Sequence, residues 1–302
     1  MPQQIPISPD ARADDPQADD ARHDGTHEVA PDVAYKRLAI VNVAFYGLAG
    51  AGDRQWVLID AALPGTAGQI AHAAAERFGP DSRPAAIVMT HGHFDHVSAL
   101  KELSDKWDVP IYAHELELPY LNGTAAYPPP DPTVGGGLMA LTSPLFPRGP
   151  IDVSARLNVL PPDGSVPFMP GWRWIHTPGH APGHVSLWRE SDRTLIAGDA
   201  FVTTAQESVY AAATQAPELH GPPMYFTPDW QSAKTSVETL AALEPEVAIT
   251  GHGRAMRGAL MRVALHALAQ NFDTVAVPDH GKYVLHPARA EDGTAYVPAK
   301  NA

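Results

Sequence analysis

The residues best suited to chemistry stand together in one short stretch, Thr90-His91-Gly92-His93-Phe94-Asp95-His96. Three imidazoles and one carboxylate within six consecutive residues are more metal ligands than folding alone requires. His91 and His93 are two residues apart, so in an extended turn both rings can point the same way. Asp95 and His96 are adjacent and should diverge toward a second position. The spacing therefore favours two metal ions over one, and these ligand types suit zinc, iron or manganese.

Two patterned segments should hold this stretch in place. Residues 85–89 form a short apolar run, Ala-Ala-Ile-Val-Met, bounded by Pro84, which is typical of a buried strand. Residues 97–103, directly after the stretch, indicate the start of a helix. The histidines and the aspartate should therefore lie on a strand-to-helix loop, where a fixed scaffold presents functional side chains.

The composition limits the partners that these side chains could serve. The chain has 302 residues, 44% of them hydrophobic, and its 21 Lys and Arg against 34 Asp and Glu give a formal net charge of −13. An acidic surface argues against nucleic acid or an anionic membrane as the main partner, which leaves a small-molecule substrate. The chain has no cysteine, so thiolate ligands and cysteine nucleophiles are excluded. No apolar run approaches the roughly 20 residues of a membrane helix, and no secretory pattern is visible, so we expect a cytoplasmic protein, with homo-oligomerisation left open.

Further strand ends carry residues of the same kinds. Asp60 ends one strand, where it could be a simple turn former or could serve the site. Residues 176–184 follow another strand and read His-Thr-Pro-Gly-His-Ala-Pro-Gly-His, while two later strands end in Gly198-Asp199 and Gly251-His252-Gly253. A buried carboxylate without a cation is costly, so a metal would explain Asp199. The sequence predicts strands over 38–46, 55–60, 172–175, 194–197 and 246–250, and helices over about 66–78, 230–243 and 258–272, the last with Leu260, Val263, Ala264, Leu268 and Phe272 available for one face.

The motif His-x-His-x-Asp-His after an apolar strand resembles the signature of the metallo-β-lactamase superfamily, in its glyoxalase II-like or lactonase-like branch. The Thr-Pro-Gly-His, Gly-Asp and Gly-His-Gly elements follow in the order that this family has. The resemblance implies an α/β fold, a four-layer αββα sandwich with a dinuclear metal site along one edge of its two sheets. It implies the following ligands: His91, His93 and His180 on one metal, Asp95, His96 and His252 on the other, and Asp199 bridging the two.

The same resemblance gives roles to residues around these ligands. Asp60 would orient the ligand loop, and Thr90 would stand beside the metals without binding them. His184 would buttress the site from the start of the next strand. His220 and Tyr225 lie in the segment that follows the bridging aspartate, so they are candidate substrate contacts.

Two segments lie outside the pattern. Residues 1–30 have almost no large apolar side chain, so we expect a disordered or surface-draped acidic tail before a single domain at 31–302. Residues 121–170 form an insertion rich in proline and glycine with apolar patches. This insertion is either a lid over the edge of the active site or a piece of surface packing.

The expected chemistry is hydrolysis. The resemblance implies two divalent ions, zinc first with iron or manganese as alternatives, and a bridging hydroxide that cleaves a small ester, thioester, lactone or phosphoester. Asp95 or Asp199 could relay a proton to the leaving group. The sequence departs from several branches of the family: many β-lactamases use a cysteine ligand, the flavin-linked di-iron branch has glutamate where His93 stands, glyoxalase II-like thioesterases have a different run after Gly-Asp, and lactonases often have tyrosine where Val202 stands.

Two rival classes remain open. An iron-dependent redox enzyme of the same fold, such as a persulfide dioxygenase, would hold one iron and consume oxygen. A metal-bound binding module would not turn over substrate, although inactive relatives usually lose ligands and none is missing here. A nuclease of this fold is disfavoured by the negative charge.

Overall fold

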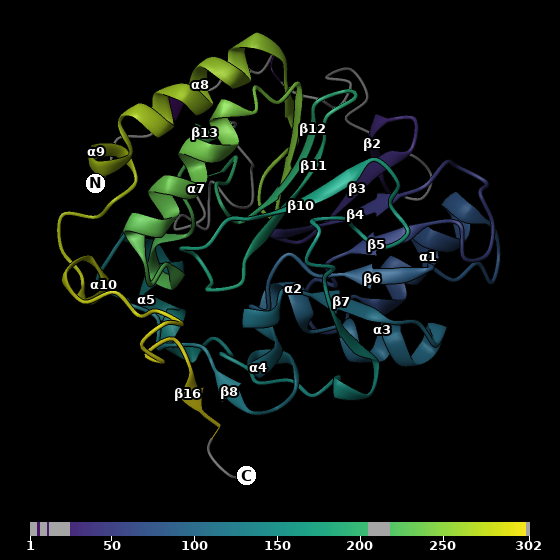
Figure 1. The fold of residues 1–302 in the computed structure, drawn as a ribbon, viewed down its shortest axis with the longest axis horizontal. Coiled ribbons are helices and arrows are strands. Elements are labelled where there is room, and N and C mark those ends of the chain that lie inside the picture. Colours follow the sequence, from purple (N-terminus) through teal and green to yellow (C-terminus); the bar gives the residue numbers. More distant parts are fainter. Residues whose placement is uncertain (1–4, 7–10, 12–24, 205–217, 300–302) are drawn as a thin grey trace.

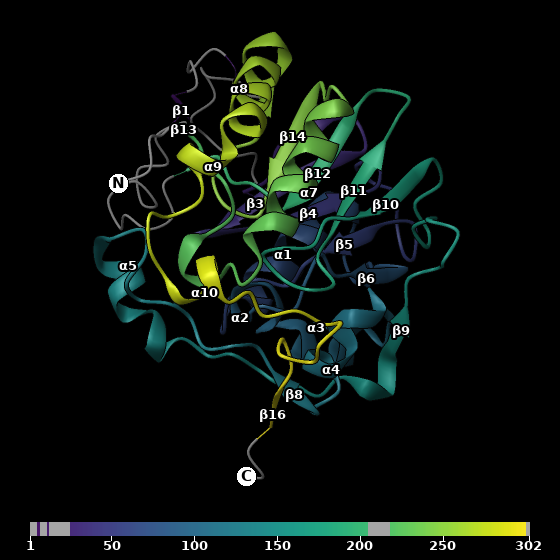
Figure 2. The same cartoon turned by 60° about the vertical axis from the view of Figure 1, so that its left-hand side comes forward.

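The computed structural model describes residues 5–6, 11, 25–204 and 218–299. Two β-sheets pack face to face at the centre, and helices cover the outer face of each sheet (Figures 1 and 2). The order of layers is helices, seven-stranded sheet, five-stranded sheet, helices. The predicted four-layer αββα sandwich is confirmed.

The seven-stranded sheet comes from the first half of the chain. Its last four strands run parallel to one another, so their carboxyl ends meet at one edge of the sheet. In spatial order the strands are β2 (His27–Ala30), β3 (Val33–Leu38), β4 (Val41–Tyr46), β5 (Val57–Ile59), β6 (Ala86–Val88), β7 (Ile111–Ala113) and β9 (Leu157–Val159).

The five-stranded sheet comes from the second half. Its strands β12 and β14 are parallel, so the residues that follow them emerge at the same end of the sheet. In spatial order the strands are β10 (Trp172–His176), β11 (Val185–Arg189), β12 (Thr194–Gly198), β14 (Val247–Thr250) and β15 (Met256–Arg257).

Apolar side chains fill three interfaces between the layers. Between the sheets, β-branched residues such as Val57 and Val88 meet Leu187 and Ile196 of the facing sheet. Each such buried side chain stabilises the fold by roughly 1.5–3 kcal/mol relative to exposure, so the sandwich is a rigid support for the loops at its edge. The outer helices are α1 (Ala67–Phe78) and α3 (Leu100–Trp107) on the first sheet, and α7 (Trp230–Ala242) and α8 (Gly258–Gln270) on the second.

Two predicted elements differ from the structure. The strand expected over 38–46 begins later, at Val41, as β4, because the chain reverses at Ala39, whose φ of 58° lies in the left-handed region; the preceding strand β3 was not predicted. Helix α8 ends at Gln270, and its buried face matches the expected one only in part. Ala264, Leu268 and, just beyond the helix, Phe272 are buried as expected, but Leu260 and Val263 are 51% and 67% exposed. Met261, Leu265 and Ala269 are buried in their place.

The folded region begins before residue 31. Strand β2 pairs with β3 and buries Val29, and the ring of His27 stacks on Tyr35, so part of the segment expected as a tail belongs to the first sheet. Strand β1 (Ile5–Pro6) also pairs with β13 (Glu218–Leu219). Residues 12–24 of the expected tail lie outside the described residues.

The insertion at 121–170 is ordered against the body. Its last strand, β9, completes the edge of the seven-stranded sheet, and Phe146 packs on Phe94 beside the histidine stretch with ring centroids 5.4 Å apart. The other elements here are α4 (Leu118–Leu121), β8 (Ala125–Ala126), α5 (Gly137–Thr142), η3 (Ser143–Leu145) and η4 (Ser154–Arg156). Near the C-terminus, α9 (Phe272–Val275) and α10 (Lys282–Leu285) precede β16 (Val297–Pro298), which pairs with β8.

Candidate metal centre

Four loops at the carboxyl ends of strands converge on one point at the edge of the sandwich. The loop after β6 carries His91 to His96, with α2 (Phe94–Val97) as its last part, and the loop between β10 and β11 carries His180. Asp199 follows β12 and His252 follows β14. Their ligand atoms form three groups, each with all atoms within 4.8 Å of one another, and every member is buried: His91, His93 and His180; His91, His96 and Asp199; Asp95, His96 and His252.

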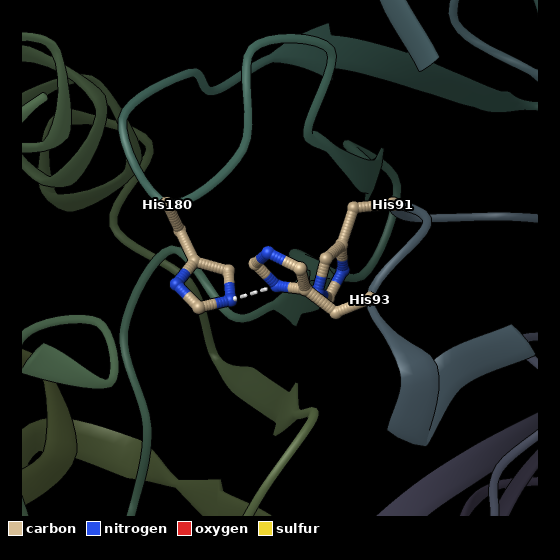
Figure 3. A group of neighbouring side chains, drawn as sticks. All are labelled: His91, His93 and His180. Atoms are coloured by element: carbon tan, nitrogen blue, oxygen red, sulfur yellow. Dashed lines mark hydrogen bonds between the residues drawn. The ribbon is translucent and has the colours of Figure 1, made fainter. Parts of the chain in front are cut away.

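We call the first and third of these groups the histidine half and the acidic half of the centre. In the histidine half the rings of His91, His93 and His180 point toward one another (Figure 3). His93 Nδ1 lies 2.8 Å from His180 Nε2. In the acidic half His252 Nε2 lies 3.4 Å from Asp95 Oδ2.

Asp199 lies between the halves. One of its oxygens, Oδ2, is 3.4 Å from His180 Nε2 and 3.1 Å from His252 Nε2. The other, Oδ1, is 3.6 Å from His96 Nε2. A single carboxylate therefore reaches both groups of ligand atoms.

Asp60 and Thr90 fix the ring of His96 from behind. Asp60 Oδ2 bonds to His96 Nδ1 at 2.8 Å and accepts the Thr90 hydroxyl at 2.7 Å, while Asp60 Oδ1 accepts the Thr90 N–H at 2.8 Å. Thr90 Oγ1 also lies 3.1 Å from His91 Nδ1. These contacts occupy the Nδ1 atoms and leave both Nε2 atoms turned toward the centre.

A backbone carbonyl in the turn before β4 and a side-chain amide on β4 hold the last loop. The carbonyl of Ile40 lies 2.7 Å from His252 Nδ1, which directs Nε2 of that ring inward. The side-chain amide of Asn42 donates through Nδ2 to the carbonyls of Thr250 and Gly253 at 2.9 and 2.6 Å. The two sheets are therefore tied together at the site by groups that the sequence did not single out.

His184 has both ring nitrogens in use. Its Nε2 accepts the N–H of Asp199 at 2.9 Å, and its Nδ1 lies 2.8 Å from the Thr177 hydroxyl. Burial is also the main cause that lowers the pKa of His184, to about 3. The ring is therefore neutral and holds the backbone at Asp199, away from the ligand groups.

The histidines of the two halves differ in pKa. In the histidine half, burial is the main cause that lowers the pKa of His93 to about 3 and those of His91 and His180 well below the usual range. Burial is also the largest influence on His96 and His252 and opposes their charge, but neighbouring carboxylates together outweigh it, so both pKa values are raised, that of His96 strongly. These carboxylates are Asp199 and Asp60 for His96, and Asp199 and Asp95 for His252.

Among the described residues, three buried ligand atoms of this centre have no hydrogen-bond partner: His91 Nε2, His96 Nε2 and Asp199 Oδ1. Unpaired buried lone pairs are costly, and imidazole nitrogen with carboxylate oxygen is a donor set for zinc or iron. The residues present therefore fit two divalent cations.

A small cavity opens beside the histidine half. His93 forms one wall, and Tyr225, one of the two candidate substrate contacts, is among the lining residues. His220 does not line this cavity, because its backbone bridges to Val202 and its Nε2 lies 3.2 Å from Glu218. The remaining lining residues are Tyr127, Pro128, Pro129, Pro130, Phe226, Pro228 and Tyr283. Residues 205–217, part of the segment expected to line the pocket, lie outside the described residues.

Glu117 and Tyr127 were missed by the sequence analysis. Glu117, the last residue of η2 (Glu115–Glu117), is fully buried and contacts the backbone of both histidine loops. No local pattern marks it, since the two glycines that it contacts are 25 and 66 residues away along the chain.

The sequence model of the metallo-beta-lactamase superfamily matches residues 38–252. The chain belongs to this superfamily. It is 48% identical over 248 residues to a probable metallo-hydrolase, YflN, of Bacillus subtilis strain 168, an alignment covering 82% of this chain and 94% of that protein.

Solved structures agree on the fold. A beta-lactamase domain protein from Burkholderia ambifaria superposes with a TM-score of 0.58 at 20% identity, covering 86% of this chain and 76% of that one. A B3 metallo-beta-lactamase with an active-site glutamic acid gives a TM-score of 0.57 at 19% identity, covering 83% and 90%. In the described part of the chain, no helix is both long and apolar enough to cross a membrane.

Proposed function

We propose that this protein is a dinuclear metal-dependent hydrolase of a small ester, thioester, lactone or phosphoester. The observation that carries the proposal is the convergence of seven buried ligand residues, Asp199 among them, from four loops on one point. His91, His93 and His180 would hold one cation, Asp95, His96 and His252 the other, and Asp199 would contact both. When bound, the two cations, zinc in our proposal, would lower the pKa of a water and polarise the scissile bond.

The protein's own residues would position the ligands and move a proton. Burial keeps His91 and His93 neutral, as imidazole ligands must be. Asp60 and the Ile40 carbonyl fix the rings of the acidic half. Asp95 or Asp199 would carry a proton to the leaving group.

The residues around the cavity beside His93 narrow the range of substrate classes that we propose. In the described residues that line it, prolines and aromatic rings predominate and no side chain carries a formal charge, since the pKa of His93 is lowered to about 3. The cavity holds only about 10 Å³, so its walls could contact a substrate without enclosing it, and such walls favour apolar, flat groups over charged ones. We therefore favour an ester or lactone with an apolar acyl or aromatic group over a phosphoester.

The test combines elemental analysis of the purified protein with a panel of chromogenic esters, lactones, thioesters and phosphodiesters. We expect two divalent ions per chain and turnover of aryl esters or lactones that is lost in H93A and restored in wild type by returning metal after chelation. One iron per chain with oxygen uptake would instead favour a redox enzyme. Two ions without turnover of any class would favour a binding module.

A further inference from the structure

The carboxylate of Glu117 lies behind the histidine half, between two loops. Its Oε2 accepts the N–H of Gly92 at 2.8 Å, and its Oε1 accepts the N–H of Gly183 at 2.8 Å. Tyr127 donates its hydroxyl to the same Oε2, and that hydroxyl oxygen also accepts the Gly92 N–H at 2.9 Å. One carboxylate thus joins the loop of His91 and His93 to the loop of His180.

These loops meet the carboxylate with bare backbone. A Cβ added at Gly92 would lie 2.8 Å from the Tyr127 hydroxyl and 3.2 Å from Glu117 Oε2. A Cβ added at Gly183 would lie 2.8 Å from Glu117 Cγ. Only glycine at both positions allows the loops to approach one side chain this closely.

The contact is electrostatically costly. Glu117 is 0% exposed, and it takes part in none of the ion pairs found in the described residues. Burial raises the pKa of Glu117 to about 7, although hydrogen bonds from Tyr127, Gly183 and Gly92 act in the opposite direction. An apolar side chain would fill the same space without this cost, but it could not accept two N–H groups from two loops.

The Glu117 contact lies against residues of the histidine half. Gly92 lies between His91 and His93, and the ring of Tyr127 packs on that of His93 with centroids 4.2 Å apart. The nitrogens of His93 and His180, which the two loops carry, are 2.8 Å apart. The acidic half has other supports, the Asp60 carboxylate and the Ile40 carbonyl.

We propose that Glu117, assisted by Tyr127, is a positioning residue that sets the spacing of the histidine half and thereby the affinity of that half for its cation. The inference rests on the proposed function in taking the cluster to bind two cations. It goes beyond that function in giving the histidine half a support of its own, Glu117, whereas Asp60 contacts His96 of the acidic half directly and His91 only through Thr90.

The test is titration of metal-free protein with Co²⁺ or Zn²⁺ in competition with a chromophoric chelator. E117Q has nearly the same shape, but its amide NH₂ would face one of the two N–H donors. We expect E117Q to bind one ion as wild type does and the other about 10–100-fold more weakly, as is usual when a partner behind a ligand is lost. The visible spectrum of the Co²⁺ bound at the weakened position should change as well.

Paired backgrounds assign the effect to a half. In H252A, which disables the acidic half, E117Q should weaken the remaining ion. In H93A, which disables the histidine half, E117Q should leave the remaining ion unchanged. Y127F keeps the carboxylate and should cause a smaller loss in the same half; it serves as the second variant if E117Q does not fold.

The outcomes separate the two proposals. Wild type that binds fewer than two ions refutes the dinuclear hydrolase. Wild type that binds two ions while E117Q and Y127F keep both affinities refutes the positioning role alone, as does an equal loss from both halves.

Discussion

The two halves of the metal centre hold similar rings in opposite electrostatic surroundings. In the histidine half, burial keeps His93 and His180 neutral without any proton competing for their nitrogens at neutral pH. In the acidic half, the carboxylate of Asp199 raises the pKa of His96 and His252 against the effect of burial. The acidic half offers more negative charge to a cation. Because the pKa values of His96 and His252 are raised, protons compete with a cation for these two rings up to a higher pH than in the histidine half. The difference teaches that the two halves should respond separately to mutation and to acid, even though they share one carboxylate.

The largest effect should come from the shared residue. D199N removes charge from both halves, and a loss of about 10–100-fold at each would combine to roughly 1,000-fold in kcat/KM. Elemental analysis at increasing metal concentration separates metal loss from loss of the proton carrier. A variant that keeps both ions and wild-type activity would show that the halves do not share Asp199.

Acid stability of the metal-free protein should distinguish Glu117 from its amide variant. The pKa of Glu117 is raised from 4.5 to about 7, so the folded state holds a proton that the unfolded state has released between these pH values. Since the folded state binds more protons, stability must fall as pH rises across this window, by about 3 kcal/mol for this group. Urea unfolding at several pH values should show this decline in wild type and a smaller one in E117Q. Parallel curves for the two proteins would contradict it.

Loss of Asp60 should affect the acidic half most. D60N weakens the direct contact with His96 Nδ1 and reaches His91 only through Thr90, so we expect about 10–100-fold weaker binding of one ion and a smaller loss at the other. Chelator competition in the H93A and H252A backgrounds identifies which ion is affected more. An equal or larger loss in the histidine half would remove the distinction between the two supports.

The smallest effect on activity should come from a residue of the cavity beside His93. Tyr283 lines it, and its hydroxyl donates to the Pro129 carbonyl at 2.6 Å. Y283A removes an aromatic contact worth about 0.5–1.5 kcal/mol, so KM for an aryl ester should rise about 2–12-fold with kcat little changed. Y283F keeps the ring and should stay near wild type. Equal KM values for Y283A and wild type would place the substrate elsewhere.

The sequence was sufficient for the fold and for bringing the ligands together, because both depend on local signals. Apolar strands ending in His, Asp or Gly mark the loops, and the resemblance of these motifs to the metallo-beta-lactamase superfamily implied the sandwich. The same resemblance pointed to Asp60, but the supports Glu117 and Ile40 were not predictable in this way. Glu117 acts on backbone N–H groups of distant loops, and Ile40 acts through its carbonyl, so neither contact depends on a recognisable residue pattern. Leu260 and Val263 were wrongly placed on the buried face of α8, because periodicity alone does not say which apolar residues a neighbouring element covers.

The hydrogen bond between the Ile40 carbonyl and His252 spans 212 residues of the chain. During synthesis, the chain would have to emerge from the ribosome beyond His252 before this contact could form. Long-range contacts of this kind slow folding, because the loop must close before any favourable interaction compensates its entropy. Assembly of the acidic half should therefore be a late event, and a nascent chain that still lacks its last strands would have no complete place to retain a second ion.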